Sequence, residues 1–199
     1  MELKGAIQSD LIITPDNEPI ITVDNLEVAQ FIYLLINNEK LRDVIDTITS
    51  KVVLILGRFT PEREVVLYAL KEELRKRNYL PILFKFEKPN SRNTTETITL
   101  LARMARFVIA DITDAKSIAQ ELGAIVPHIP SVPVQPLLEY SQNEYGMFES
   151  MRDYHWVLET YYYKSISEVL ASINEKVISP AEAKVREILE KRTSLYQKA

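Results

Sequence analysis

Acidic and hydroxyl side chains gather directly after one apolar segment of the sequence. Residues 107–110 are apolar and lead into Asp111 and Asp114, and Ser117 begins the next predicted helix. Glu121 lies four residues after Ser117, so both occupy one side of that helix, one turn apart. The segment therefore brings a glutamate, two aspartates and a hydroxyl group to one place, where they could act on a bound ligand.

Residues after two other predicted strands extend this candidate site. Arg58 and Phe59 follow the first predicted strand, and Lys88 follows the second. We expect the two cations to meet a phosphate group, assisted near Arg58 by the backbone amides of the helix that begins after it. The alternative for Arg58 is a salt bridge with Glu62 or with Asp111.

The composition excludes several other chemistries. The 199 residues include no cysteine, two histidines and four glycines. Without cysteine there is no disulfide, no zinc finger, no iron–sulfur cluster and no thiol nucleophile. Two histidines cannot build a three-histidine metal site, and four glycines leave no room for a glycine-rich phosphate or dinucleotide loop. Catalysis is left to carboxylate, hydroxyl, Lys/Arg or backbone-amide groups, and we expect neither a metal nor a resident cofactor.

Charge and hydropathy also limit the partners. The net charge is −4 and the pI is about 5.4, which argues against a broad nucleic-acid-binding face. The longest apolar run, Val28–Ile36, is far shorter than the roughly 20 residues of a membrane span. The first residues lack the order of a signal peptide. We therefore expect a cytoplasmic protein without a membrane or nucleic-acid partner.

Alternating strands and helices must position the candidate site. Four short apolar, β-branched runs alternate with amphipathic segments, which predicts an α/β fold with an open, mostly parallel sheet of four to five strands and helices on both faces. The carboxyl ends of parallel strands meet at one edge, where such folds bind ligands. The predicted strands span 51–57, 80–86, 106–111 and 132–138.

Local signals predict where two of the helices begin and end. Thr60 followed by Pro61 is typical of a helix N-cap and first position, and Asn78 is suited to a left-handed residue after the last turn. Gly123 is expected to let the helix that carries Glu121 pack closely on a neighbouring element.

Both ends of the chain depart from the alternating pattern. Residues 1–24 suggest a β-hairpin, and 25–48 suggest one or two helices that are apolar nearly all round. Such helices are buried, either against the sheet domain or in another chain. A helix over 165–177 is expected on the sheet edge, and Pro180 is expected to open a last, charged helix. The predicted domains are an extension over 1–49, an α/β domain over 50–178 and a C-terminal helix over 179–199.

Two motifs resemble a known superfamily. Ala110–Thr113 reads Ala-Asp-Ile-Thr and Ser117–Gly123 reads Ser-Ile-Ala-Gln-Glu-Leu-Gly. They resemble the strand ending in ADLT and the helix beginning NVxYELG of Rossmannoid domains related to nucleoside 2-deoxyribosyltransferases and to Toll/interleukin-1 receptor (TIR) domains. The resemblance covers about residues 51–138 and implies a flavodoxin-like or TIR-like sheet.

The resemblance implies roles for individual residues. In that group the helix glutamate attacks or stabilises the anomeric carbon of a nucleoside or of NAD, which implies a catalytic role for Glu121. Asp111 and Asp114 would then orient the ribose or base, with Thr113 and Ser117 beside them at the ligand. Cleavage of an N-glycosidic bond passes through a cationic state that a carboxylate stabilises or captures.

The sequence also departs from the group. Ser117 stands where asparagine is frequent, and Gln120 stands where an aromatic residue is frequent. The stretch from about Asp10 to Lys184 is also similar to an uncharacterised module attached to pentapeptide-repeat proteins, and this second resemblance implies no established chemistry.

Three functions remain open at this stage. The first is a TIR-like nucleotide-binding domain, an N-glycosidase that cleaves NAD or a nucleoside. The second is a non-catalytic sensing or assembly module that forms a homo-oligomer or attaches to a repeat domain. The third is a deoxyribosyltransferase of base salvage, whose usual substrate-clamping residues are not evident.

Overall fold

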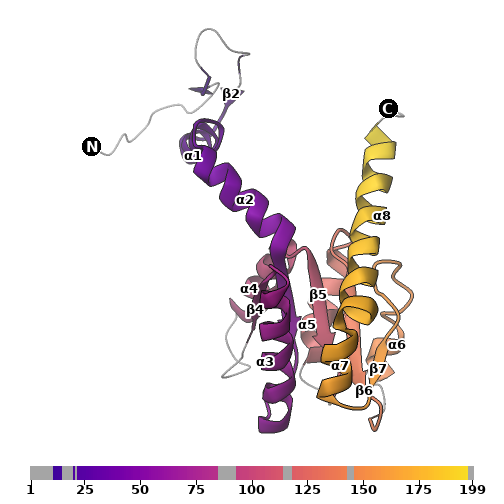
Figure 1. Cartoon of the computed structure of the whole chain (residues 1–199). Coiled ribbons are helices and arrows are strands. Elements are labelled where there is room, and N and C mark those ends of the chain that lie inside the picture. The colour runs from indigo at the N-terminus through magenta and orange to yellow at the C-terminus, as the bar shows by residue number, and fades with distance from the viewer. Residues whose placement is uncertain are drawn as a thin grey trace. The chain divides into compact units, whose positions relative to one another are not determined.

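A computed structural model of the chain describes residues 11–14, 20, 22–84, 93–113, 118–142 and 146–196. The chain divides into two compact units, residues 1–47 and residues 48–199. The larger unit carries the α/β fold and the candidate site (Figure 1).

The larger unit is built on a parallel sheet of five strands in the order β4-β3-β5-β6-β7. Counted from β3, this order is 2-1-3-4-5, the flavodoxin-like form of the doubly wound fold, whose switch point lies between β3 and β5. The predicted fold class is confirmed. The strands are β3 (Val52–Leu56), β4 (Leu80–Leu83), β5 (Phe107–Asp111), β6 (Val134–Glu139) and β7 (Tyr161–Tyr163).

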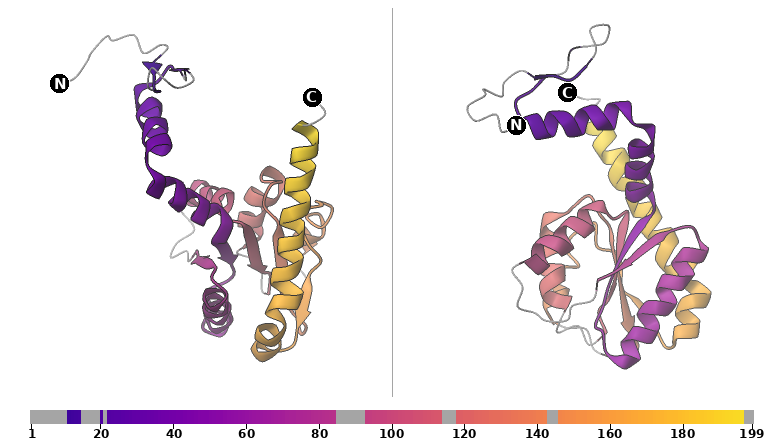
Figure 2. Two further views of the ribbon diagram at one scale, coloured as in Figure 1. Left: turned by 45° about the horizontal axis from the view of Figure 1, so that its top comes forward. Right: turned by 90° about the vertical axis from the view of Figure 1, so that its left-hand side faces the viewer.

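Helices cover both faces of the sheet (Figure 2, right). Each face has its own hydrophobic core, because successive residues of a strand point to opposite faces. The first face is covered by α4 (Asn93–Met104), α5 (Ile118–Ile125) and the short 3₁₀ turn Val126–His128, with α6 (Gly146–Glu149) nearby. The second is covered by α3 (Pro61–Lys76), α7 (Ile166–Ile173) and α8 (Ser179–Tyr196).

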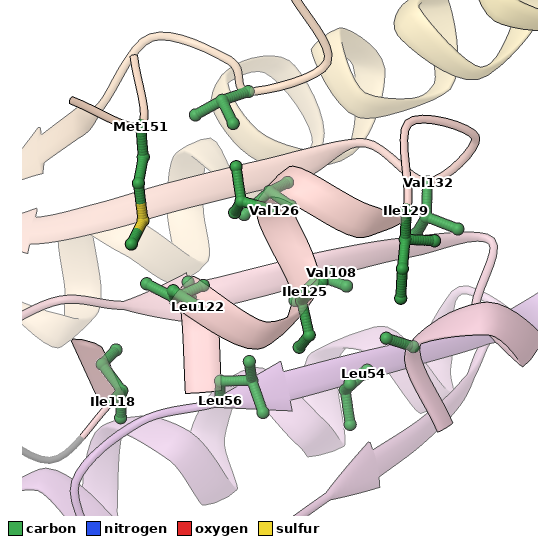
Figure 3. Close-up of a cluster of buried hydrophobic side chains, with 14 of the residues drawn as sticks. Leu54, Leu56, Val108, Ile118, Leu122, Ile125, Val126, Ile129, Val132 and Met151 are labelled. Atoms are coloured by element: carbon green, nitrogen blue, oxygen red, sulfur yellow. The ribbon is translucent and has the colours of Figure 1, made fainter. Parts of the chain in front are cut away.

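The core of the first face fixes the position of α5. Ile118, Leu122 and Ile125 are buried, and Figure 3 shows them beside Leu54 and Leu56 of β3. These three α5 residues recur at spacings of four and three, which places them on one side of the helix. The rotation of α5 about its axis is therefore set by apolar burial.

Both predicted helix signals of α3 are confirmed. The Thr60 side chain caps the helix by accepting a hydrogen bond from the backbone N–H of Arg63 (3.4 Å), and Pro61 occupies the first position. At the other end Asn78 has φ 63°, the left-handed conformation that asparagine tolerates better than most residues.

The C-terminal region differs from the prediction. Helix α8 begins at Ser179, so Pro180 lies in its first turn as predicted, but α8 follows α7 without a break, through a π-helical turn over Asn174–Ile178. Proline has no N–H for the usual bond to residue 176, and the wider π turn adapts the helix to that loss. This helix packs on the face of the sheet beside α3, through Val169, Ile173 and Val177, because those residues form one apolar stripe.

The prediction for Gly123 is wrong. A Cβ atom added there would meet no heavy atom of the described residues within 4 Å, because Gly123 is off the buried side of α5. Gly57 holds the close approach instead: its added Cβ would lie 2.6 Å from Leu67 Cδ2 and 3.3 Å from Asp111 Cβ.

The smaller unit contains the predicted hairpin and helices. Strands β1 (Leu11–Ile12) and β2 (Thr22–Val23) pair antiparallel, and α1 (Leu26–Asn37) and α2 (Glu39–Lys51) follow. Asn25 caps α1 by accepting a hydrogen bond from the N–H of Val28 (2.9 Å). In the part of the chain that the structure describes, no helix is long and apolar enough to cross a bilayer.

Candidate functional site

The carboxyl edge of the sheet carries a buried ion pair at the switch point. Asp111, the last residue of β5, is fully buried, and its Oδ2 accepts hydrogen bonds from Nε (3.1 Å) and Nη2 (2.5 Å) of Arg63. Arg63 lies in the first turn of α3 and is itself 7% exposed. A charge pair so far from water must be well bonded on both sides to be tolerated.

Three further residues complete the bonding of this pair. Arg63 Nη2 also donates to the hydroxyl of Tyr163 at the end of β7, and Nη1 donates to Glu139 Oε2 at the end of β6 (2.6 Å). The backbone N–H of Thr113 donates to Asp111 Oδ1 (3.2 Å). Thr113 Oγ1 accepts from the N–H of Glu139 (3.0 Å) and lies 3.5 Å from the Tyr163 hydroxyl. We call these five residues the Arg63 cluster.

Electrostatics in the Arg63 cluster keep the guanidinium charged and the phenol neutral. Burial alone would lower the pKa of Arg63, but the adjacent Asp111 carboxylate raises it well above its ordinary value. Burial, reinforced by Asp111, also raises the pKa of Tyr163. The cluster thus holds one cation, a neutral hydroxyl donor and two carboxylates in a fixed set of bonds, and it ties together the ends of β5, β6 and β7.

Glu121 lies on the other face of the sheet. Asp111 shares the orientation of Phe107 and Ile109, which belong to the core under α3, whereas Glu121 sits on α5 beside the buried Leu122. The structure therefore does not bring Glu121 and Asp111 together in one set of contacts.

One oxygen of the partly buried Glu121 carboxylate has no hydrogen bond among the described residues. Its Oε2 atom is buried, and none of the described residues supplies a hydrogen-bond partner to it. Glu121 lies three residues after Ile118 and four before Ile125, on the sheet-facing side of α5. Burial raises the pKa of Glu121, because the charged form loses water, and a backbone hydrogen bond offsets this only in part.

The other candidate residues lie in different environments. Arg58 and Phe59 are half-buried after β3, and Phe59 packs against the core under α3. Asp111, one of the two salt-bridge partners considered for Arg58, pairs with Arg63. Lys88, Asp114 and Ser117 lie outside the described residues.

Sequence reasoning missed Arg63, Glu139 and Tyr163. One signal for Arg63 was available: a cation in the first turn of a helix is disfavoured by the helix dipole, so its presence there indicates a compensating acid. For Glu139 and Tyr163, the one available signal was a position at the ends of the last two strands. Nothing local distinguished them from surface residues.

The described residues provide little support for other kinds of site near this edge. Within the described ranges, no group of three or more His, Asp or Glu side chains is placed to hold a metal ion. A cavity of about 570 Å³ lies at the opposite edge, where β6 and β7 begin, lined by Gln135, Glu159, Tyr161, Lys176 and Lys184 among others. Its two lysines are paired with Glu175 and Glu187, so neither is an unsatisfied cation.

Comparisons with known proteins leave the family open. No protein-family model matches the chain, and a search of curated proteins found no match. Among solved structures, the chain is similar to the lysine decarboxylase LdcF of Francisella novicida, with a TM-score of 0.44 and 14% identity. The match covers 66% of this chain and 17% of the decarboxylase. The protein is thus a Rossmann-like α/β domain, a conclusion that rests on its own strand order.

Proposed function

We propose that the α/β unit binds a small nucleotide-like ligand and cleaves its N-glycosidic bond through Glu121. The observation that carries this proposal is the buried Oε2 atom of Glu121, which has no hydrogen-bond partner among the described residues. Burying a carboxylate oxygen without a hydrogen bond costs stability, so such a group is a candidate for a function that needs it. The resemblance of Ser117–Gly123 to the TIR-like helix motif supports the same residue.

The proposed reaction needs one carboxylate and water. The bond between C1′ of the ribose and the base nitrogen breaks, and its electron pair leaves with the base. The ionised Glu121 carboxylate stabilises or captures the cationic C1′, and water then adds its hydroxyl group there. The proton of that water goes to the base of a neutral nucleoside, or to solvent when the base leaves a pyridinium nucleotide such as NAD.

A direct test compares Glu121→Gln with the wild type. Purified protein is incubated with NAD and, separately, with 2′-deoxynucleosides, and the released base is measured by chromatography. We expect release by the wild type and a loss of about 100-fold or more in Glu121→Gln, because the amide cannot stabilise the cation. Glu96→Gln, at an exposed glutamate in the first turn of α4, is the matched control and should keep full activity.

The pH profile supplies a second readout. The proposed role requires ionised Glu121, and burial raises its pKa. Activity should therefore fall as the pH is lowered through a value above that of an ordinary glutamate. Activity that survives in Glu121→Gln, or the absence of base release from every substrate, overturns the catalytic proposal.

One observation favours a non-catalytic module as the second candidate. Asp111, to which the resemblance gives a ribose-orienting role, has both carboxylate oxygens bonded within the protein and no exposed surface. A module of this kind binds a nucleotide without turnover. Calorimetric titration with NAD separates the two candidates, because binding without release of nicotinamide supports only the second.

A further inference from the structure

The sheet is interrupted between β6 and the segment that leads into β7. Val134 of β6 forms an isolated parallel bridge with Val157, and the next pairing joins Leu137 to Tyr161. The step from 134 to 137 is three residues, whereas the step from 157 to 161 is four, so the segment before β7 carries one residue more, as in a β-bulge. Pro136 lies in the same interval and has no N–H to donate. Backbone carbonyl groups in this interval therefore need another donor.

The side chain of Gln135 supplies that donor. Its Nε2 atom donates hydrogen bonds to the backbone oxygen of Pro136 (3.1 Å) and to that of Glu159 (2.9 Å). These two partners fix which end of the amide is the nitrogen, because a carbonyl oxygen can only accept. The bulge therefore explains why a polar side chain that is 1% exposed stands inside the sheet. It accounts for the nitrogen of the amide and not for the oxygen.

The amide oxygen of Gln135, Oε1, is an open acceptor. It accepts no hydrogen bond from the described residues. It is also not sealed inside the protein, since among the described residues the one sealed side-chain atom without a partner is Glu121 Oε2. Gln135 lines the cavity of about 570 Å³ at this edge, so the small accessible surface of Oε1 opens into that cavity. A nearly buried acceptor of this kind favours a ligand with an N–H or O–H group.

A second acceptor without a donor lies next to Gln135. Glu159 lines the same cavity, and its carboxylate has no hydrogen bond or ion pair within the part of the chain that the structure describes. Its backbone oxygen is bonded to Gln135 Nε2, so the two residues are in direct contact. A carbonyl oxygen and a carboxylate side by side suit a primary ammonium group, which has three N–H donors and a positive charge.

The continuous helix formed by α7 and α8 brings cations to the cavity. Lys176, Pro180 and Lys184 recur every four residues, on one side of the helix, and all three line the cavity. Lys176 lies in the π-helical turn, a feature that is frequent at functional sites. Lys184 donates to Glu187 (2.6 Å), and Glu187 also accepts from Lys191 (2.6 Å). Lys184 can therefore turn to an anion without leaving Glu187 unpaired.

The rest of the lining and the volume limit the size of the ligand. Val157, Leu158, Tyr161 and Pro180 give the cavity an apolar part. Small-molecule sites measure about 300–1,000 Å³, and the cavity falls within that range. Such a cavity suits a small molecule with a short apolar group and charges of both signs.

We propose that this cavity binds a small zwitterion, an α-amino acid with an apolar side chain. The ammonium group donates to Gln135 Oε1 and to the Glu159 carboxylate, and the carboxylate of the ligand accepts from Lys184. The inference does not depend on the proposed cleavage reaction, because Glu121 is not among the residues that line this cavity.

Thermal unfolding of the full chain tests for binding. The probes are valine, leucine, isoleucine, methionine and phenylalanine as free L-amino acids, each at about 10 mM. We expect at least one of them to raise the unfolding temperature by about 2 °C or more, because a ligand that binds the folded state stabilises it. Calorimetric titration then gives the dissociation constant. If none of the five changes the unfolding temperature, the proposal is wrong.

Analogues of the amino acid that binds test the assignment of its groups. For leucine these are 4-methylpentanoate, which lacks the ammonium group, and 3-methylbutylamine, which lacks the carboxylate. N,N,N-trimethyl-leucine keeps both charges but has no N–H to donate to Gln135 Oε1. Each analogue should bind at least about 10-fold more weakly than the amino acid. An analogue that binds as tightly overturns the role given to the group that it lacks.

Variants of the lining test the site itself. Lys184→Met should weaken binding at least about 10-fold, whereas Lys191→Met, which removes the other lysine bonded to Glu187, should change it by less than about 2-fold. Glu159→Gln should also weaken binding at least about 10-fold, with Glu190→Gln, at an exposed residue of α8, as its control. Equal effects of a variant and its control place the ligand elsewhere and overturn the proposal.

Discussion

Two acidic residues from the same stretch of sequence, Asp111 and Glu121, occupy contrasting environments. Asp111 is fully buried, and both of its oxygens accept hydrogen bonds, from Arg63 and from the backbone of Thr113. Glu121 is half-buried, and its buried Oε2 has no partner among the described residues. The bonds of Asp111 are made within the fold, whereas burial raises the pKa of Glu121.

The difference separates a structural carboxylate from a candidate functional one. A buried acid whose bonds are all made within the fold holds strands and helices together and has nothing left for a ligand. A buried acid with an unmade bond lowers stability and is retained only where something else requires it. The comparison therefore moves the candidate chemistry from the α3 face of the sheet to the α5 face.

The largest effect should come from removing the cation of the Arg63 cluster. Arg63→Met leaves Asp111 as a buried, unpaired charge, so we expect the free energy of unfolding to fall by about 3–5 kcal/mol. Urea denaturation measures this loss. Arg106→Met removes the more exposed Arg106–Glu182 pair and should cost only about 1 kcal/mol.

A double variant tests whether the ion pair is the cause of this loss. Arg63→Met combined with Asp111→Leu removes both charges, and much of the lost stability should return. If the double variant is as unstable as the sum of the two single variants, the ion pair is not the reason for the loss, and the structural role assigned to Asp111 is wrong.

Alanine substitutions at Gly57, beside Asp111, and at Gly123, on α5, should change the free energy of unfolding in opposite directions. Gly57→Ala forces a Cβ to within 2.6 Å of Leu67 Cδ2 and close to Asp111, so we expect a loss of about 1–3 kcal/mol. Gly123→Ala adds a methyl group in open space within α5 and should gain about 0.5–1 kcal/mol from helix propensity. Thermal unfolding of both variants provides the measurement, and a gain in Gly57→Ala contradicts the close packing at the end of β3.

The smallest effect should be the dependence of stability on the charge of Glu121. Its pKa in the folded state is raised above the ordinary 4.5, so the folded protein binds its proton more tightly than the unfolded chain. The contribution of Glu121 to stability is therefore highest below pH 4.5 and decreases as the pH rises through the raised pKa.

Glu121→Gln removes that dependence. Urea denaturation between pH 4 and pH 8 should show the variant gaining on the wild type as the pH rises, with a constant difference once Glu121 is fully ionised. Glu96→Gln, on an exposed side chain, should show no such trend. If the difference in unfolding free energy between wild type and Glu121→Gln does not change with pH, the pKa of Glu121 is not raised by burial.

Much of the fold could be predicted because its signals are local. The strand β3 is an apolar run followed by Gly57, β5 is an apolar run that ends at Asp111, and α3 is preceded by Thr60 and followed by Asn78. Each of these signals depends on neighbours within a few residues. The short strand β7 carried no such signal, because Tyr161–Tyr163 is too brief to show a period and its tyrosines equally suit a loop or a core.

The candidate site could be predicted only in part. Asp111 was expected at the carboxyl edge of the sheet, but its bond to Arg63, 48 residues away in the sequence, was not predicted. In the sequence, Arg58 after β3 and Arg63 in the first turn of α3 are at similar distances from Asp111. The packing of α3 on the sheet places Arg63 against the carboxylate.

The sequence by itself determined the alternation of strands and helices, the ends of α3 and the carboxylate character of the candidate site. The tertiary packing decided which of the two acids pairs with a cation among the described residues. Strands buried on both faces are apolar throughout, so their sequence does not reveal which face each residue meets. That choice depends on how β5, α3 and α5 pack, and it placed Asp111 against Arg63 and Glu121 on the opposite side of the sheet.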